Sequence, residues 1–470
     1  MTQSKQLMKN TAIYAVGNIG SKVLAYIMVL VYSHYISSEE LGYYDLILAT
    51  VSMIYPIVAC QISDAVYRYL IDAEDKTREI ILATTFKFLL VTTSISVIIF
   101  SFISSEYNLK YAVWIALYLV STIFYFFFHD AIRGLAENRK YAMVGILNSI
   151  FMLLIEIFGL LILKMGVLAL LVANVLSMFF CIGLMICWQD QFWHLFRTKF
   201  NKAIFLELIK YSSPLVPNTI CWWVVNSSDR YIILLFLGAS FNGIYAISNK
   251  FPTILTTITG IFYLAWQESA IKEYNSPNRD VFFSDIFNKY YNLLFSLCVA
   301  AIPMTHIVIE LFVGAEYVTA WQYSGFLYLG AAFSALCSFL GLGYQISKET
   351  IRSTMTTIIA AVINLIVNLV LIKNIGLHAA SLSTFIAYLF LFFYRIIHTK
   401  RYFTLSVSWK EFFSRLGLVF LVMIETFLIR NLIVSAFVAV CSAVYIFIIN
   451  KEIFCPIIIS IKNKMRNENR

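Results

Sequence analysis

The chain has 470 residues, of which 60% are hydrophobic and only 13% are charged, and its formal net charge is +9. Soluble domains carry about 25% charged residues, so this composition, with a mean hydropathy of +0.80, excludes a water-soluble globular protein. The surplus of bases does not require nucleic-acid binding, because a membrane protein concentrates bases on one side of the bilayer.

A helix needs about 20 apolar residues to cross the hydrocarbon core of a membrane. Applied in chain order, this rule predicts an all-α polytopic membrane protein with about fourteen transmembrane helices. The predicted spans are residues 11–36, 42–67, 80–104, 111–132, 141–163, 167–188, 208–237, 243–271, 290–313, 318–346, 351–372, 376–397, 413–429 and 432–450. The first run is too long for a signal-peptide core and lacks a cleavage site, so we expect it to remain as a helix.

The distribution of bases predicts the orientation of these helices. With the N-terminus placed in the cytoplasm, 27 of the 35 Lys and Arg fall on the cytoplasmic side, 4 in outer loops and 4 deeper inside spans. The 27 include four bases within three residues of a cytoplasmic span end, at Lys210, Arg352, Arg395 and Arg415. This asymmetry follows the positive-inside rule, so both termini are predicted to be cytoplasmic.

Two pairs of similar turns suggest an internal repeat. "ELGYYDLI" (40–47) resembles "FNGIYAIS" (241–248), and "LKMGVLAL" (163–170) resembles "IKNIGLHAA" (372–380). Glycine turns recur in many polytopic proteins, but two matched pairs about six helices apart favour duplication. Parallel repeats of this kind are a transporter architecture.

The repeat predicts two pseudo-symmetric six-helix lobes followed by two additional helices. The predicted parts are an N-terminal lobe (1–188), an amphipathic cytoplasmic linker (189–207), a C-terminal lobe (208–400), two further transmembrane helices (401–450) and a basic cytoplasmic tail (451–470). We expect the linker to form an interfacial helix with aromatic side chains in lipid and Arg197, Lys199 and Lys202 towards anionic headgroups. A role in binding a partner is the alternative.

Motifs for catalysis, cofactors or metals are missing from the sequence. There is no HExxH, Walker A, GxSxG or dinucleotide-binding glycine loop. The six histidines are dispersed and never spaced i, i+4, and the eight cysteines show neither zinc spacing nor a disulfide rhythm. The sequence therefore predicts no enzyme, no metal site and no cofactor.

Four bases lie well inside predicted spans, away from their ends, where an ionisable group costs at least about 2.5–3.5 kcal/mol and usually faces a cavity or a partner. Lys22 lies near the middle of the first span, and Lys87 lies in the cytoplasmic third of the third span. Arg230 and Lys250 flank the turn between the seventh and eighth spans and should lie at equal depth. We predict that these four bases bind an anionic substrate, with snorkelling to the interface as the alternative for Lys87.

Acidic residues within the spans are the candidates for ion coupling or for structural pairing. We single out Asp64, Glu156, Asp229 and Glu268. Asp64 and Glu268 lie near cytoplasmic ends and are equally explained as interfacial groups, and Glu425 in the short thirteenth span can mark a misplaced boundary.

The seventh span combines charge with helix breakers. Neighbouring residues in a helix point about 100° apart, so we expect Asp229 to hold a neighbouring helix while Arg230 reaches the interior. Pro214 and Pro217 permit bending and predict a gate or hinge. The alternative is that Arg230 pairs with Glu268 or Glu156 and never meets substrate.

Three segments carry a resemblance to a known family. They are "LMKNTAIYAVGNIGSKVLAYIMVLVYSHYISSEELGYY", "IRGLAENRKYAMVGILNSI" and "YSSPLVPNTICWWVVNSSDRYIILLFLGASFNGIYAISNK". They resemble the Wzx-type flippases of bacterial polysaccharide biosynthesis, in the multidrug/oligosaccharidyl-lipid/polysaccharide superfamily. The Pro-x-x-Pro, Asp-Arg and Gly-x-Tyr arrangement around the seventh and eighth spans is the most specific part.

The resemblance implies transport of an undecaprenyl-pyrophosphate-linked oligosaccharide from the inner to the outer leaflet of the bacterial cytoplasmic (inner) membrane, for capsule, exopolysaccharide or O-antigen synthesis. It also implies a polysaccharide polymerase and glycosyltransferases as partners in the same pathway, and a groove for the lipid tail at the last two spans. Two alternatives stay open: a cation-coupled multidrug exporter of the same fold, and a membrane glycosyltransferase or polymerase of the same pathway.

Overall fold

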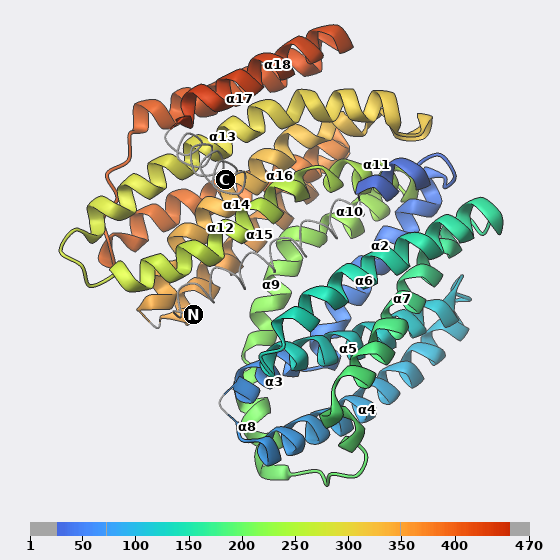
Figure 1. Ribbon diagram of the computed structural model, residues 1–470. Helices are drawn as coiled ribbons and strands as arrows, with labels where there is room; N and C mark the ends of the chain where they lie inside the picture. The colour runs from blue at the N-terminus through green and yellow to red at the C-terminus, as the bar shows by residue number, and fades with distance from the viewer. Residues whose placement is uncertain (1–25, 72, 348, 452–470) are drawn as a thin grey trace, which may run out of the picture. The chain divides into compact units, whose positions relative to one another are not determined.

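The computed structural model describes residues 26–71, 73–347 and 349–451, and these form helices and no β-strand (Figure 1). Eleven of the described helices are long and apolar enough to cross a membrane. The chain is therefore an all-α polytopic membrane protein, as the hydropathy predicted.

The helices group into two compact units, residues 1–243 and 244–470. The first contains α2 (Ser38–Val58), α3 (Ile62–Ile71), α4 (Asp75–Glu106), α5 (Ala112–Gly134), α6 (Asn138–Ile157), α7 (Val167–Trp188), α8 (Lys202–Ser212), α9 (Leu215–Ser227) and α10 (Asp229–Phe236). In this unit α5 packs against α3, α4, α6 and α7. The core is aromatic and aliphatic, with Phe127, Phe128 and Met185 buried.

The division between the units falls inside α11 (Ala239–Lys250). The second unit continues with α12 (Pro252–Glu273), α13 (Arg279–Phe312), α14 (Trp321–Ile346), α15 (Thr350–Ile375), α16 (Leu377–His398), α17 (Trp409–Ile429) and α18 (Leu432–Ile449). Helix α14 is its most buried span and packs on α12, α13 and α16, while α17 and α18 pack along α13 (Figure 1).

Several predicted spans are interrupted. The seventh consists of α8, α9 and α10, with the first break between Ser212 and Leu215, where Pro214 stands. The second span is divided into α2 and α3 by Cys60 and Gln61, both of which have positive φ although neither is glycine. A positive φ is uncommon in residues other than glycine. Hydropathy carries no information on backbone angles, so it did not predict this break.

The prediction that the linker forms a regular helix is wrong. Residues Asp190–His194 form a short 3-10 helix, and a regular α-helix begins only at Lys202. Asn201 caps that helix, because its side-chain oxygen accepts from the backbone N–H of Ala203 at 2.9 Å and of Ile204 at 3.1 Å.

One pair of matched turns adopts the same backbone conformation in both places. Gly166 precedes α7 with φ 57° and ψ −140°, and Gly376 precedes α16 with φ 58° and ψ −138°. Side chains strongly disfavour this region of φ and ψ. Glycine is therefore required at each turn by the same local geometry.

Candidate functional site

The polar centre of the first unit is an ion-pair cluster around Arg230 in α10. Its Nε donates to Asp45 Oδ2 of α2 at 2.7 Å, and its Nη1 donates to Asp229 Oδ1 at 3.2 Å and to the Asn226 carbonyl at 2.9 Å. The exposed side-chain fractions are 14% for Arg230, 11% for Asp45 and 3% for Asp229. We call Arg230, Asp45 and Asp229 the arginine cluster.

The sequence predicted that Asp229 holds a neighbouring helix while Arg230 reaches the interior. In the structure the Arg230 side chain pairs with Asp229 and also contacts the neighbouring helix α2, through Asp45. The first carboxylate oxygen of Asp229 in addition accepts from the Arg230 backbone N–H at 3.0 Å. Ion pairs this well buried are stable only when the groups are also hydrogen-bonded, as they are here.

Helix α2 and the start of α11 approach each other unusually closely at two glycines. A Cβ at Gly42 would lie 1.8 Å from the carbonyl oxygen of Ala239, and a Cβ at Gly243 would lie 1.9 Å from that of Ser38. Neither position can hold a side chain without moving a backbone. The two glycines therefore permit a backbone-to-backbone contact that no other residue allows.

Polar contacts extend this approach along α2. Ser38 and Ser240 hydroxyl oxygens lie 2.6 Å apart, and Asn242 donates to the Gly42 carbonyl at 2.7 Å. Further along α2, the Thr50 hydroxyl lies 2.5 Å from that of Tyr231 in α10. We call these contacts, with the glycine contact and the arginine cluster, the α2 clasp.

Glu156 is buried, with 2% of its surface exposed, at the point where α6 passes into a π-helical turn (Phe158–Ile162). Nearby helices are joined by a buried polar contact, in which Asn174 of α7 donates to the Tyr44 hydroxyl of α2 at 2.7 Å. Glu156 is therefore a buried carboxyl group in the part of the first unit where α6 packs against α7.

Lys87 and Asp64 lie apart from the arginine cluster and contact other groups. Lys87 Nζ donates to the Thr198 carbonyl at 2.6 Å, so in this structure it contacts the segment before α8. Asp64 is exposed and accepts from Gln61 Nε2 at 2.9 Å.

The remaining predicted residues are placed as follows. Lys22 lies outside the described residues, and the side chain of Glu268 in α12 is likewise not described. Lys250 is the last residue of α11 and belongs to the second unit. Pro217 lies in the first turn of α9, three residues after the interruption at Pro214.

Arg395 was counted among the cytoplasmic bases, but it is buried in α16 with 2% of its surface exposed. Its Nη1 donates to the Cys337 carbonyl at 2.9 Å, and its Nη2 donates to the Thr356 hydroxyl at 2.8 Å and, more weakly, to the Thr357 hydroxyl at 3.2 Å. These bonds join α14, α15 and α16. Residue type and depth alone do not distinguish such a fixed cation from a substrate-binding one.

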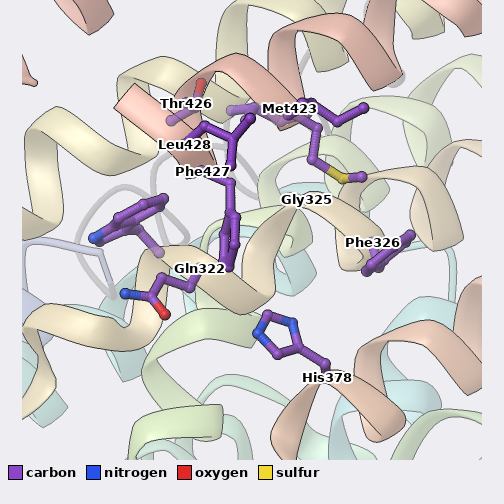
Figure 2. A pocket seen from close by; sticks show the side chains of 11 residues that line it. Gln322, Gly325, Phe326, His378, Met423, Thr426, Phe427 and Leu428 are labelled. Carbon is purple, nitrogen blue, oxygen red and sulfur yellow. The ribbon is translucent and has the colours of Figure 1, made fainter. Parts of the chain in front are cut away.

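The second unit contains a largely apolar cavity of about 400 Å³ between α13, α14, α16 and α17. Figure 2 shows Gln322 and His378 at one side of it and Met423 and Phe427 of α17 at the other. No sequence pattern predicts this cavity, since its lining comes from four separated helices. Among the described residues, no group of three or more His, Cys, Asp or Glu could hold a metal ion.

Comparisons with known proteins identify the family. A family model described as "Polysaccharide biosynthesis protein" matches residues 7–271, more than half of the chain. No curated protein matches the chain.

Solved structures establish the fold. The chain is similar to the lipid II flippase MurJ in an inward closed conformation, with 13% identity and a TM-score of 0.70 over 94% of this chain and 100% of that one. It is also similar to an inward-facing MATE multidrug transporter of the MOP superfamily (13% identity, TM-score 0.64, 83% of this chain and 95% of that one). The Vibrio cholerae MATE transporter VcmN gives 10% identity and a TM-score of 0.57, over 84% of this chain and 96% of that one. The chain therefore belongs to the polysaccharide biosynthesis protein family.

Proposed function

We propose that this protein flips an undecaprenyl-pyrophosphate-linked oligosaccharide from the cytoplasmic to the outer leaflet of the bacterial cytoplasmic membrane, for assembly of a capsule, exopolysaccharide or O-antigen. The observation that carries the proposal is the match to the polysaccharide biosynthesis family combined with a fold that a lipid II flippase shares over 94% of the chain. The structural similarity to the two multidrug transporters compared above extends over less of this chain, 83–84% of its residues.

The charges inside the spans suit such a substrate. A diphosphate and a sugar chain cannot enter hydrocarbon unaided, and bases in a water-filled path offer charge-assisted hydrogen bonds to the diphosphate. We assign Lys22 and Lys250 to this contact. Arg230 joins them when its carboxylate partners Asp45 and Asp229 exchange for the substrate's phosphates. Lys87 differs from the other three bases, because its ammonium group donates to the Thr198 carbonyl.

Alternating access requires that the α2 clasp opens. Its contacts tie α2 to α10 and α11 at the end that the charge distribution predicts to face outwards. Opening the path to the outer leaflet would separate these helices, and the interruption at Pro214 supplies a bending point in the same segment. Glu156 and Asp229 are the candidates for coupling this movement to a proton or sodium gradient.

The isoprenoid tail needs an apolar surface. The cavity beside α17 is lined mainly by apolar and aromatic side chains, including Met423 and Phe427 (Figure 2). We propose that α17 and α18 form the surface along which the tail lies during transport. The polymerase and glycosyltransferases of the same pathway would act on the product and supply the substrate.

The deciding experiment is depletion of the protein followed by localisation of the lipid-linked oligosaccharide. We expect the complete oligosaccharide to accumulate on the cytoplasmic face, where a membrane-impermeant glycosidase added outside spheroplasts does not reach it. A glycosyltransferase or polymerase would instead leave an incomplete or unpolymerised sugar on the lipid. A multidrug exporter would leave its amount and location unchanged and increase sensitivity to cationic drugs.

A further inference from the structure

The segment between α7 and α8 packs one side of its chain into the first unit. Phe192 and Leu195 are each 3% exposed and belong to the core cluster of that unit. These two residues fix which side of the segment faces away from the protein.

Other residues of the segment present large aromatic side chains to the surroundings. The exposed fraction is 61% for Trp193, 73% for Phe196 and 45% for Phe200. Exposed bases are interspersed with them, at Arg197, Lys199 and Lys202. Aromatic rings beside bases are typical of segments that lie at the boundary between lipid headgroups and acyl chains.

Three anchors hold the segment in place. Lys87 of α4 donates to the Thr198 carbonyl at 2.6 Å, and the Thr84 hydroxyl one turn earlier accepts from the Asn201 backbone N–H at 3.1 Å. At the other end, Lys140 of α6 donates to the Gln189 side chain at 2.9 Å. The exposed rings are therefore presented by a backbone that is bonded to two membrane-spanning helices.

We propose that this surface, formed by Trp193, Phe196, Arg197, Lys199, Phe200 and Lys202, binds anionic phospholipid headgroups. We call it the linker surface. Helix α7 is apolar enough to span the membrane and ends at Trp188, so the segment starts at the membrane boundary. The three bases outnumber the one exposed acid of the segment, Asp190.

The contact has a consequence for the following helices. Asn201 is both the last anchored residue and the cap of α8, and α8 leads through the break at Pro214 to Arg230 in α10. Lipid binding at the linker surface thus holds the start of this interrupted span in place, while we expect the rest of the span to bend. The lipid contact itself does not depend on which substrate the protein transports.

The test uses the full chain in nanodiscs in which phosphatidylcholine is replaced stepwise by phosphatidylglycerol, with either lipid carrying brominated acyl chains. The signal of Trp193 is the difference between the wild type and Trp193→Phe. We expect brominated phosphatidylglycerol to quench this signal at a lower mole fraction than brominated phosphatidylcholine. Each base near an anionic surface contributes a factor of about five in affinity, by conversion of about 1 kcal/mol.

The variant Arg197→Gln/Lys199→Gln/Lys202→Gln should therefore lose the preference for the anionic lipid. Its matched control neutralises three other exposed bases on the same predicted face, Lys76→Gln/Lys400→Gln/Lys410→Gln, and should keep it. Equal quenching by both lipids in the wild type, or the same loss in the control, would overturn the proposal. So would a Trp193 signal that neither lipid quenches, which is the result for a surface that binds a soluble partner.

Discussion

Removal of the Arg230 side chain separates a structural role of this residue from a role in transport. Arg230→Ala leaves the carboxylates of Asp45 and Asp229, with exposed fractions of 11% and 3%, without their guanidinium partner. Breaking a buried ion pair from one side costs about 3–5 kcal/mol. At about 2–4 °C per kcal/mol for a unit of this size, the unfolding midpoint should fall by about 6–20 °C.

The double variant Arg230→Ala/Asp45→Asn also neutralises one of the two carboxylates that lose their contact with Arg230. It should therefore recover a large part of the lost stability. If Arg230 contacts the substrate, the double variant stays defective in flipping although it is folded. The assay is flipping of a fluorescent lipid-linked oligosaccharide in proteoliposomes, normalised to folded protein, alongside thermal unfolding. Arg279→Ala is the control, because its pair with Asp280 is more exposed and should be worth about 1 kcal/mol or less. Recovery of flipping together with stability would refute a role of Arg230 in substrate contact.

Four further outcomes are expected. A disulfide between Ser38→Cys and Ser240→Cys, whose hydroxyl oxygens lie 2.6 Å apart, should block flipping until a reductant is added; unimpaired flipping by the crosslinked protein would contradict the need for the α2 clasp to open. In intact cells an impermeant thiol reagent should label a cysteine at 240 and leave one at Thr77 unlabelled, and labelling of the latter would contradict the predicted orientation. Lys87→Gln should lower the unfolding midpoint and increase proteolysis near Thr198, while flipping per folded molecule is retained. Lys22→Ala should abolish flipping at normal membrane levels, Lys22→Arg should retain more activity than Lys22→Gln, and equal activity of Gln and Lys would exclude a charge contact there.

The long helices could be predicted because one physical quantity determines them. Every uninterrupted apolar run of about 20 residues must satisfy its backbone hydrogen bonds internally, so it becomes a helix. The run 167–188 and helix Val167–Trp188 agree residue for residue. The interruptions of the helices were harder to predict. Hydropathy averaged over such a run of residues does not detect two residues of positive φ, such as Cys60 and Gln61.

Only part of the arginine cluster could be predicted from the sequence. Arg230 and Asp229 stand out because charge is rare in an apolar run, but Asp45 lies close to the end of its predicted span and reads as an interfacial group. Its partner is 185 residues away, and which acid meets Arg230 depends on how α2 packs against α10. Depth can be estimated from position in a span, whereas the direction of a side chain around the helix axis cannot be estimated when the whole surface is apolar.

The matched turns at 40–47 and 241–248 show how a repeat in the sequence is related to a packing contact in the structure. Counted from Ser38 and from Ala239, each glycine is the fifth residue, at Gly42 and Gly243. In the structure, Gly42 faces the carbonyl of Ala239 and Gly243 faces the carbonyl of Ser38, at nearly equal distances. The contact is reciprocal, because each turn supplies the glycine that leaves room for a backbone carbonyl of the other turn. Glycine is thus needed twice for one contact, and its recurrence in the sequence follows from the packing of one turn against its counterpart.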